Sequence, residues 1–228
     1  MNLEKKYIDE KIWVIENFLT KEELDWFRPW IDDPNDWYIT MRSPYKNIMN
    51  KFLNTVPEYD ANGNLVFPHP NSKIIEHEIF SKPGGIWDRL ESVLPKHYKR
   101  HNTLQSFKYM TDEEIKSNLD KSVIDSYGIS EDKIDFAMYW HEDHNPNQPV
   151  FNSSFSLYLN DDFEGGELEF LDKKISIKPK AGMLVGVPVE EGYTHRVAKV
   201  RGPNSRHTLY GNCWNDPDTV PVSTSEDC

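Results

Sequence analysis

The stretch YLNDDFEGGELEFLDKKISIKPKAGMLVGVP, residues 158–188, decides the fold class. Within it, short apolar or alternating runs are separated by the turn-forming pieces NDDFEGG and KPKAG. Alternation bounded by Gly, Pro, Asn and Asp is typical of β-strands. The same pattern of apolar runs and turn residues continues before and after this stretch. We predict strands over residues 134–140, 153–159, 166–170, 174–177, 183–187, 195–200 and 207–214. Strands at this spacing predict an antiparallel sandwich or jelly roll.

The first third of the chain has a different pattern. Residues 12–18, IWVIENF, are predicted to form a short apolar strand. Thr20 and Glu23 then make a capping-box pattern, which opens an amphipathic helix through about Trp30. Residues 32–71 are rich in Pro, Asn and aromatic residues, so we expect long ordered loops there with at most one hairpin.

Two further helices are predicted before the strands begin, over about residues 86–98 and 112–127. Thr111 and Glu114 form a second capping-box pattern at the start of the later helix. The fold class is therefore mainly β (α+β), with a jelly-roll core in the C-terminal half and flanking N-terminal helices. We expect one domain over residues 1–228, made of a helical and loop support region (1–131), a catalytic core (132–214) and a tail (215–228).

Composition excludes some classes of function. The formal net charge is -12 and the sequence pI is about 5.1, which argues against nucleic-acid binding because phosphate neutralisation needs clustered Lys and Arg. The two cysteines, Cys213 and Cys228, are too few for a disulfide framework and favour a reducing compartment. The sequence has neither a secretory signal nor an apolar run of membrane-spanning length. We therefore expect a soluble, cytoplasmic protein that binds no membrane; its oligomeric state stays open.

The residues that carry chemistry are centred on His141-Glu142-Asp143, which follow a predicted strand. In an extended chain residues i and i+2 share a face, so His141 and Asp143 point the same way, roughly 6–7 Å apart along the backbone. His195 comes 52 residues after Asp143, and a closed β core can bring it alongside. Two imidazoles and one carboxylate with open positions are the ligand set of non-haem Fe(II) oxygenases.

His-x-Asp alone is a weak motif, and a solvated surface pair is the commoner explanation for it. The ordered set is more specific, because Arg206 follows His195 by 11 residues at the start of another predicted strand. A buried Arg needs an anionic partner, and a dicarboxylate held by the guanidinium fork would supply one. His144 lies in an Asn/Pro turn and His207 has the opposite parity to Arg206, so we expect neither to be a ligand.

Four motifs together, HEDH, YLNDDFEGGELEF, KPKAGMLVGVP and THRV…RHTLYGNCW, resemble the catalytic domain of the Fe(II)/2-oxoglutarate oxygenases, and specifically their prolyl 4-hydroxylase-like branch. The resemblance is close over Met138–Trp214 and looser over Ile12–Phe27, where IWVIENFLTKEEL is similar to the segment that begins those domains. It implies a double-stranded β-helix, the jelly roll that the strand pattern predicts.

The resemblance also implies roles for single residues. His141, Asp143 and His195 match the metal ligands, and Arg206 matches the basic residue that binds the far carboxylate of 2-oxoglutarate. Residues 201–205 make the spacing before Arg206 one residue longer than the family pattern, so Arg201 competes for that role. The family's second carboxylate contact is often a Tyr; Tyr139 shares the face of His141 and is the candidate. No catalytic residue beyond the metal ligands is implied.

The implied activity is that of a dioxygenase (procollagen-proline dioxygenase-like) with Fe(II) and 2-oxoglutarate as cofactors and ascorbate as a candidate reductant. It would release succinate and CO2 while hydroxylating an unactivated C–H bond, most often of a peptidyl proline. A peptide or protein substrate is expected, and a free amino acid or another small molecule stays open. The rivals are a non-catalytic jelly-roll module that binds a ligand, and a zinc hydrolase, which the His-Glu-x-x-His spacing of zincins disfavours.

Overall fold

The computed structural model describes residues 3–33, 37–43, 46–51, 58–59, 65–66, 77–95, 104–114, 135–143 and 151–214. Side chains are described over these ranges except in 37–66 and at the two positions 151 and 214. Outside the described part lie His144, the tail over 215–228 and most of the helix predicted over 112–127. The predicted division at residue 131 stays a prediction, because residues 115–134 are outside it as well.

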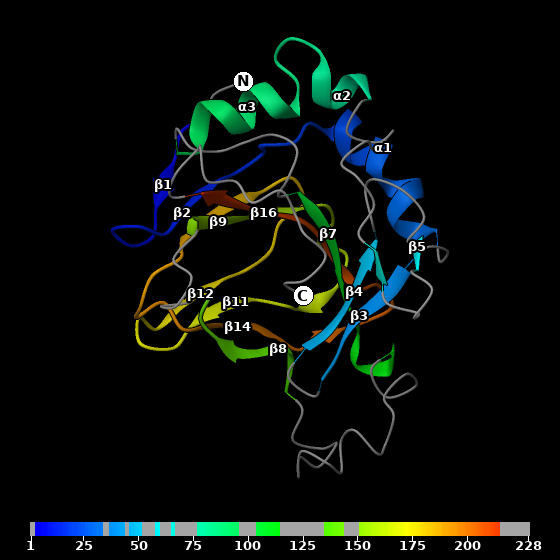
Figure 1. Cartoon of the computed structure of the whole chain (residues 1–228), viewed down its shortest axis with the longest axis vertical. Coiled ribbons are helices and arrows are strands. Elements are labelled where there is room, and N and C mark those ends of the chain that lie inside the picture. The colour runs from blue at the N-terminus through cyan, green and yellow to red at the C-terminus, as the bar shows by residue number, and fades with distance from the viewer. Residues whose placement is uncertain are drawn as a thin grey trace.

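One long antiparallel sheet organises the described chain (Figure 1). Its order is β1-β2-β13-β9-β16-β7-β4-β8-β14-β11-β12, with β3 attached to β4. Two small pairs, β10 with β15 and β5 with β6, complete the strands. The bounds are β1 Lys6–Tyr7, β2 Trp13–Ile15, β3 Trp37–Ser43, β4 Lys46–Lys51, β5 Glu58–Tyr59, β6 Leu65–Val66, β7 Gln105–Tyr109, β8 Phe136–His141, β9 Phe151–Tyr158, β10 Glu164–Gly165, β11 Leu168–Phe170, β12 Ile175–Ile177, β13 Leu184–Pro188, β14 His195–Ala198, β15 Val200–Arg201 and β16 Arg206–Trp214.

The sheet folds into two layers, which Figure 1 shows one above the other. The first contains β2, β13, β9 and β16, and the second contains β8, β14, β11 and β12. Side chains alternate between the two faces of the first layer: Leu157 and Leu184 belong to a core on one side, Tyr158 and Val185 to a core on the other. This period of two is the pattern on which the strand predictions rested.

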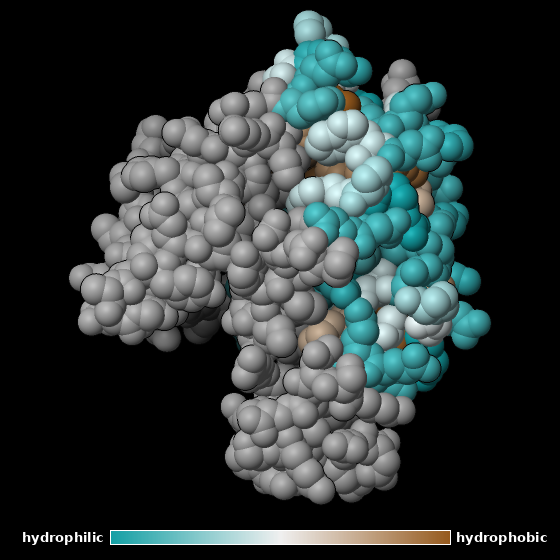
Figure 2. Space-filling view, turned by 90° about the vertical axis from the view of Figure 1, so that its right-hand side faces the viewer, coloured by the Kyte–Doolittle hydropathy of each residue, from teal (hydrophilic) through white to brown (hydrophobic). Residues whose placement is uncertain are grey.

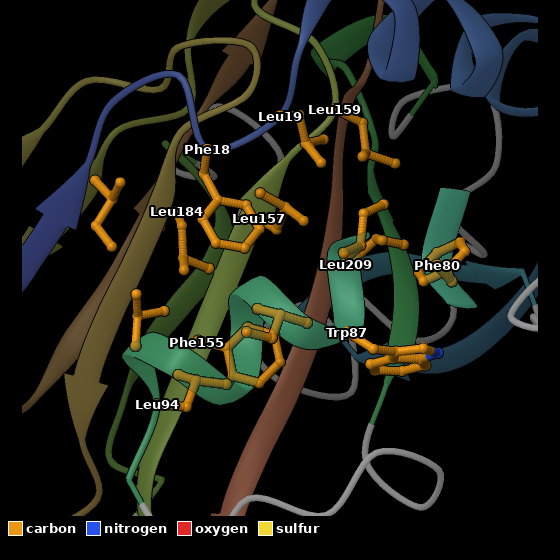
Figure 3. Packing of buried hydrophobic residues seen from close by; sticks show 14 of the residues in the cluster. Phe18, Leu19, Phe80, Trp87, Leu94, Phe155, Leu157, Leu159, Leu184 and Leu209 are labelled. Carbon is orange, nitrogen blue, oxygen red and sulfur yellow. The ribbon is translucent and has the colours of Figure 1, made fainter. Parts of the chain in front are cut away.

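Helices cover the outer face of the first layer (Figure 1). They are α1 (Lys21–Asp32), α2 (Glu78–Ser81) and α3 (Ile86–Val93). Figure 3 shows Leu157, Leu184 and Leu209 of the sheet gathered with Phe18 and Leu94 in the resulting core. None of the described helices is long and apolar enough to cross a membrane. On the side drawn in Figure 2, the coloured surface is mostly hydrophilic.

The helix starts follow the predicted capping chemistry. The Thr20 hydroxyl accepts from the Glu23 backbone N–H, and the Glu23 carboxylate accepts from the N–H of Thr20. The same reciprocal bonds join Thr111 and Glu114. A buried ion pair from Glu23 to Arg89, 2.8 Å, ties α1 to α3.

Two predicted boundaries and one predicted number of hairpins were wrong. α3 ends at Val93 and not near residue 98, because Leu94 precedes a proline and takes an extended conformation (φ -84, ψ 162). The run over 166–170 is interrupted, since Gly165 and Gly166 both have positive φ and β11 begins only at Leu168. Residues 32–71 hold two hairpins, β3 with β4 and β5 with β6, where at most one was expected.

Candidate metal and cosubstrate site

Two of the three predicted ligands face each other across neighbouring strands. His141 ends β8, and its partner on β14 is His195, with ring centroids 4.4 Å apart. Asp143 lies two residues beyond the end of β8. Its Oδ1 is 3.5 Å from His141 Nε2 and its Oδ2 is 3.9 Å from His195 Nε2. One ligand atom of each residue lies within 4.8 Å of the other two, so the structure brings the predicted set together.

Both imidazoles are oriented by the backbone. His141 Nδ1 lies 2.8 Å from the carbonyl oxygen of Tyr139, and His195 Nδ1 lies 2.9 Å from that of Tyr193. A carbonyl only accepts, so each Nδ1 carries the proton and each Nε2 presents its lone pair. The His141 Nε2 atom is buried and has no hydrogen-bond partner among the described residues. The donor set and its tautomers therefore fit a divalent transition metal such as Fe(II).

Asp143 is held in its ionised form. Ser154 Oγ donates to its Oδ2 at 3.2 Å, and the Tyr210 hydroxyl lies 3.3 Å from the same oxygen. Burial raises the pKa of Asp143, but the neighbouring His141 and His195 and the Ser154 hydroxyl outweigh it and keep this pKa below its ordinary value. Burial also lowers the pKa of His195, which favours the neutral imidazole that a metal requires.

Glu142 lies between the ligands His141 and Asp143 in the sequence, and its side chain forms hydrogen bonds with the segment just before His195. Its Oε1 accepts from the Gly192 backbone N–H at 3.1 Å and from the Thr194 hydroxyl at 2.8 Å. Thr194 immediately precedes His195. The Glu142 carboxylate therefore joins the end of β8 to the start of β14, next to both imidazoles.

Arg206 begins β16 and is 1% exposed. Its guanidinium lies over the rings of Tyr109 (4.3 Å) and Tyr158 (4.8 Å), and its Nη2 donates to the Tyr158 hydroxyl at 3.1 Å. Its Nε and Nη1 atoms are buried without a hydrogen-bond partner in the described part of the chain. Because a buried cation needs a counter-charge, this group fits an anionic ligand with two acceptor oxygens.

The other sequence candidates lie elsewhere. Arg201 is exposed on β15, where its strand partner is Glu164, so the geometry favours Arg206 over Arg201 as the anion anchor. Tyr139 is 40% exposed and its ring packs against Phe136, 4.9 Å between centroids. The tyrosine that touches the Arg206 guanidinium by a hydrogen bond is Tyr158.

Sequence reasoning did not single out several residues of the site. Tyr158 is part of the quoted YLNDD motif and ends a predicted strand, so its parity could have identified it. Tyr109 belongs to β7, which we did not predict, and it is the strand partner of Arg206. Ser154 and Tyr210 lie on predicted strands, but only the pairing of β9 with β16 brings them to one carboxylate.

Comparisons with known proteins agree with this geometry. Residues 128–214 match the sequence model of the 2OG-Fe(II) oxygenase superfamily, and this segment contains all three ligands and Arg206. Among curated proteins, the sequence has no match.

Solved structures share the fold at low sequence identity. A prolyl hydroxylase from Trichoplax adhaerens, in complex with a hypoxia-inducible-factor peptide fragment, has a TM-score of 0.59 and 14% identity, covering 94% of this chain and 88% of its own. A Pseudomonas putida prolyl-4-hydroxylase has a TM-score of 0.55 and 15% identity, covering 90% and 93%. A viral collagen prolyl hydroxylase from Paramecium Bursaria Chlorella virus-1 has a TM-score of 0.50 and 15% identity, covering 90% and 95%.

The three converging ligand atoms, Arg206 and the strands β8, β14 and β16 all lie in the segment that matches the superfamily model. The fold is the double-stranded β-helix of the prolyl hydroxylases, and its ligand set fits Fe(II). Residues 128–214 are therefore similar to the 2OG-Fe(II) oxygenase superfamily, and the chain shares the fold of prolyl hydroxylases.

Proposed function

We propose that the chain hydroxylates an unactivated C–H bond of a peptidyl proline, with Fe(II) held by His141, Asp143 and His195 and 2-oxoglutarate held by Arg206. The observation that carries the proposal is the presence of two features in one β core: three converging ligand atoms, and a buried guanidinium of which two nitrogens have no hydrogen-bond partner among the described residues. The first suits a metal with open coordination positions, and the second suits the far carboxylate of a dicarboxylic acid.

Each residue has a defined task in this proposal. The two imidazoles keep their protons on Nδ1, so that both Nε2 atoms are free to bind metal. Asp143 stays ionised, and Arg206 together with the Tyr158 hydroxyl orients the cosubstrate. Bound Fe(II) would supply the activation of O2 that is coupled to conversion of 2-oxoglutarate to succinate and CO2, with one oxygen atom entering the substrate. We assign no further catalytic residue, and Tyr158 replaces Tyr139 as the proposed second contact.

The substrate class is the finer part of the proposal. One of the similar structures is a prolyl hydroxylase in complex with a hypoxia-inducible-factor peptide fragment and another is a collagen prolyl hydroxylase, which supports a peptide substrate here. The net charge of -12 favours a peptide that carries Lys or Arg. Ascorbate as reductant and a cytoplasmic location are parts of the proposal, the latter supported by the buried free thiol of Cys213.

The test is anaerobic reconstitution with Fe(II) and 2-oxoglutarate, followed by succinate release against a panel of proline-containing peptides. We expect a weak visible absorption band that requires both additions, and peptide-dependent succinate. Asp143→Ala should abolish both, while Asp172→Ala, at an exposed position, should leave both unchanged. Succinate formation at the wild-type rate by iron-loaded Asp143→Ala would refute the ligand assignment.

The same experiment separates the alternatives. A non-catalytic module would show the absorption band without any succinate above the background. Succinate that depends on a free amino acid or another small molecule, and not on a peptide, would keep the chemistry and replace the substrate class.

A further inference from the structure

Asn160 holds the backbone on both sides of Arg206. Its side chain is buried, 4% exposed, two residues beyond the end of β9. Its Nδ2 donates to the carbonyl oxygen of Ser205 and its Oδ1 accepts from the backbone N–H of His207, both at 2.8 Å. The two backbone groups belong to the residues immediately before and after the guanidinium carrier.

Asn160 lies where β16 extends beyond the end of β9, so a side chain is needed to bond the backbone groups beside Arg206. On one edge of β16, Arg206 pairs with Tyr109 of β7. On the other edge the partner strand β9 ends at Tyr158, which pairs with Thr208. On the β9 side the His207 carbonyl still accepts from the Leu159 N–H, but the His207 N–H and the Ser205 carbonyl lie beyond the last residue pair of the two strands. The Asn160 amide supplies the donor and the acceptor that a continuing strand would have supplied.

The orientation of the amide is fixed by a second acceptor. Asn160 Nδ2 also donates to Asp162 Oδ1 at 2.8 Å. The other oxygen of Asp162 accepts from Arg28 of α1 at 2.6 Å and from Asn204 at 3.0 Å. Two acceptors on one side and an N–H on the other leave only one consistent assignment of the amide nitrogen and oxygen.

From this geometry we propose that Asn160 is a positioning residue, which sets the point where the Arg206 side chain enters the core and thereby the affinity for the far carboxylate of 2-oxoglutarate. The inference rests on the proposed role of Arg206. Residues 202–205 form the turn that precedes Arg206, and Asn160 holds the end of that turn through the Ser205 carbonyl. The two charge-assisted hydrogen bonds from a guanidinium to a carboxylate depend on direction as well as distance. A shift of the backbone at Arg206 therefore weakens both of these bonds.

The test compares two 2-oxo acids. Asn160→Asp keeps the size of the side chain but loses the bond to the Ser205 carbonyl; Asn160→Ala loses all the contacts. Dissociation constants are measured for 2-oxoglutarate and for 2-oxobutyrate, which lacks the far carboxylate, on Fe(II)-loaded protein without oxygen. We expect about tenfold weaker binding of 2-oxoglutarate in both variants, with the affinities for 2-oxobutyrate and Fe(II) unchanged. In an Arg206→Met background the Asn160 substitutions should add nothing.

Two control variants separate positioning from general loss of stability. Asp161→Ala removes the bond that the Ala181 N–H donates to the Asp161 carboxylate, next to Asn160 in the sequence, and leaves both bonds of the Asn160 amide to the neighbours of Arg206 in place. Val93→Ala opens a cavity in the helical core on α3. We expect 2-oxoglutarate binding within about twofold of wild type for both. Equal weakening of 2-oxoglutarate and 2-oxobutyrate in the Asn160 variants, or unchanged binding of both, would overturn the inference.

Failure of the proposed function looks different. If the wild type binds no 2-oxo acid, the role of Arg206 and this inference fall together. If it binds 2-oxoglutarate and the Asn160 variants bind equally well, only the inference falls. Amide hydrogen exchange gives a readout that is independent of the cosubstrate: Asn160→Ala should speed exchange of the His207 N–H, because its acceptor is lost.

Discussion

Replacing Arg206 by Met should have opposite effects on stability and on cosubstrate binding. The guanidinium is 1% exposed, and two of its nitrogens have no partner in the described part of the chain. Exchange of a buried ion pair for apolar side chains of similar volume is often neutral or stabilising by about 1–4 kcal/mol. Because the Arg206 guanidinium has no ion-pair partner among the described residues, its replacement leaves no counter-charge unpaired, and we expect stability to be unchanged or higher. The same change removes two charge-assisted hydrogen bonds to 2-oxoglutarate, about 1.5–3 kcal/mol each. At the lower end this is about 3 kcal/mol, which weakens 2-oxoglutarate binding by on the order of 100-fold.

The assay is thermal unfolding of anaerobic, Fe(II)-loaded protein with and without 2-oxoglutarate. Without the cosubstrate, Arg206→Met should unfold at the wild-type temperature or above it, and the upward shift that 2-oxoglutarate gives the wild type should vanish. Arg201→Met, at an exposed position, should keep the full shift. A persistent shift in Arg206→Met, lost in Arg201→Met, would refute the argument and move the anchor to Arg201.

Two further predictions concern other parts of the site. Glu142→Ala should weaken Fe(II) binding by about tenfold, measured by competition with a chelator, because it removes the oxygen that accepts from Gly192 and Thr194 and so the brace on His195; an unchanged affinity would contradict the bracing role. Burial lowers the pKa of His207 to about 3, so between this value and the unfolded value of about 6.5 only the unfolded chain binds the proton, and stability falls as pH falls. At pH 5 this lowers the free energy of unfolding of the wild type by about 2 kcal/mol. Urea unfolding at pH 7.5 and at pH 5 should therefore show a decrease that is about 2 kcal/mol smaller in His207→Gln than in the wild type. Equal decreases in the two proteins would show that the His207 imidazole is not the source.

The sequence allowed good predictions where a local pattern determines the structure. Alternation over residues 153–159 and 183–187 gives β9 and β13, because each strand packs one face on the helices and one on the second layer. The capping chemistry of Thr20 with Glu23 involves only neighbouring residues and was confirmed. The end of α3 was missed although the proline after Leu94 marks it.

What the sequence could not reveal depends on contacts between distant segments. The sequence of β7, QSFKY, is short and has no clear apolar alternation, and the segment becomes a strand by pairing with β16 and β4. Tyr109 therefore could not be placed under Arg206 beforehand. The convergence of His141, Asp143 and His195, in contrast, followed from the ordered motifs, although their function as metal ligands remains a proposal.

The opposition of His141 and His195 across β8 and β14 makes the alignment of these two strands a condition for metal binding. A slip of one residue would set Thr194 or Arg196 opposite His141 and turn the His195 imidazole to the other face of the sheet. The pairing already contains irregular steps on either side of Val197, so its alignment is not enforced by an unbroken ladder. A metal ion bound to both imidazoles would select one alignment of the two strands. The ion would then stabilise the pairing of β8 with β14 in addition to its role in the reaction.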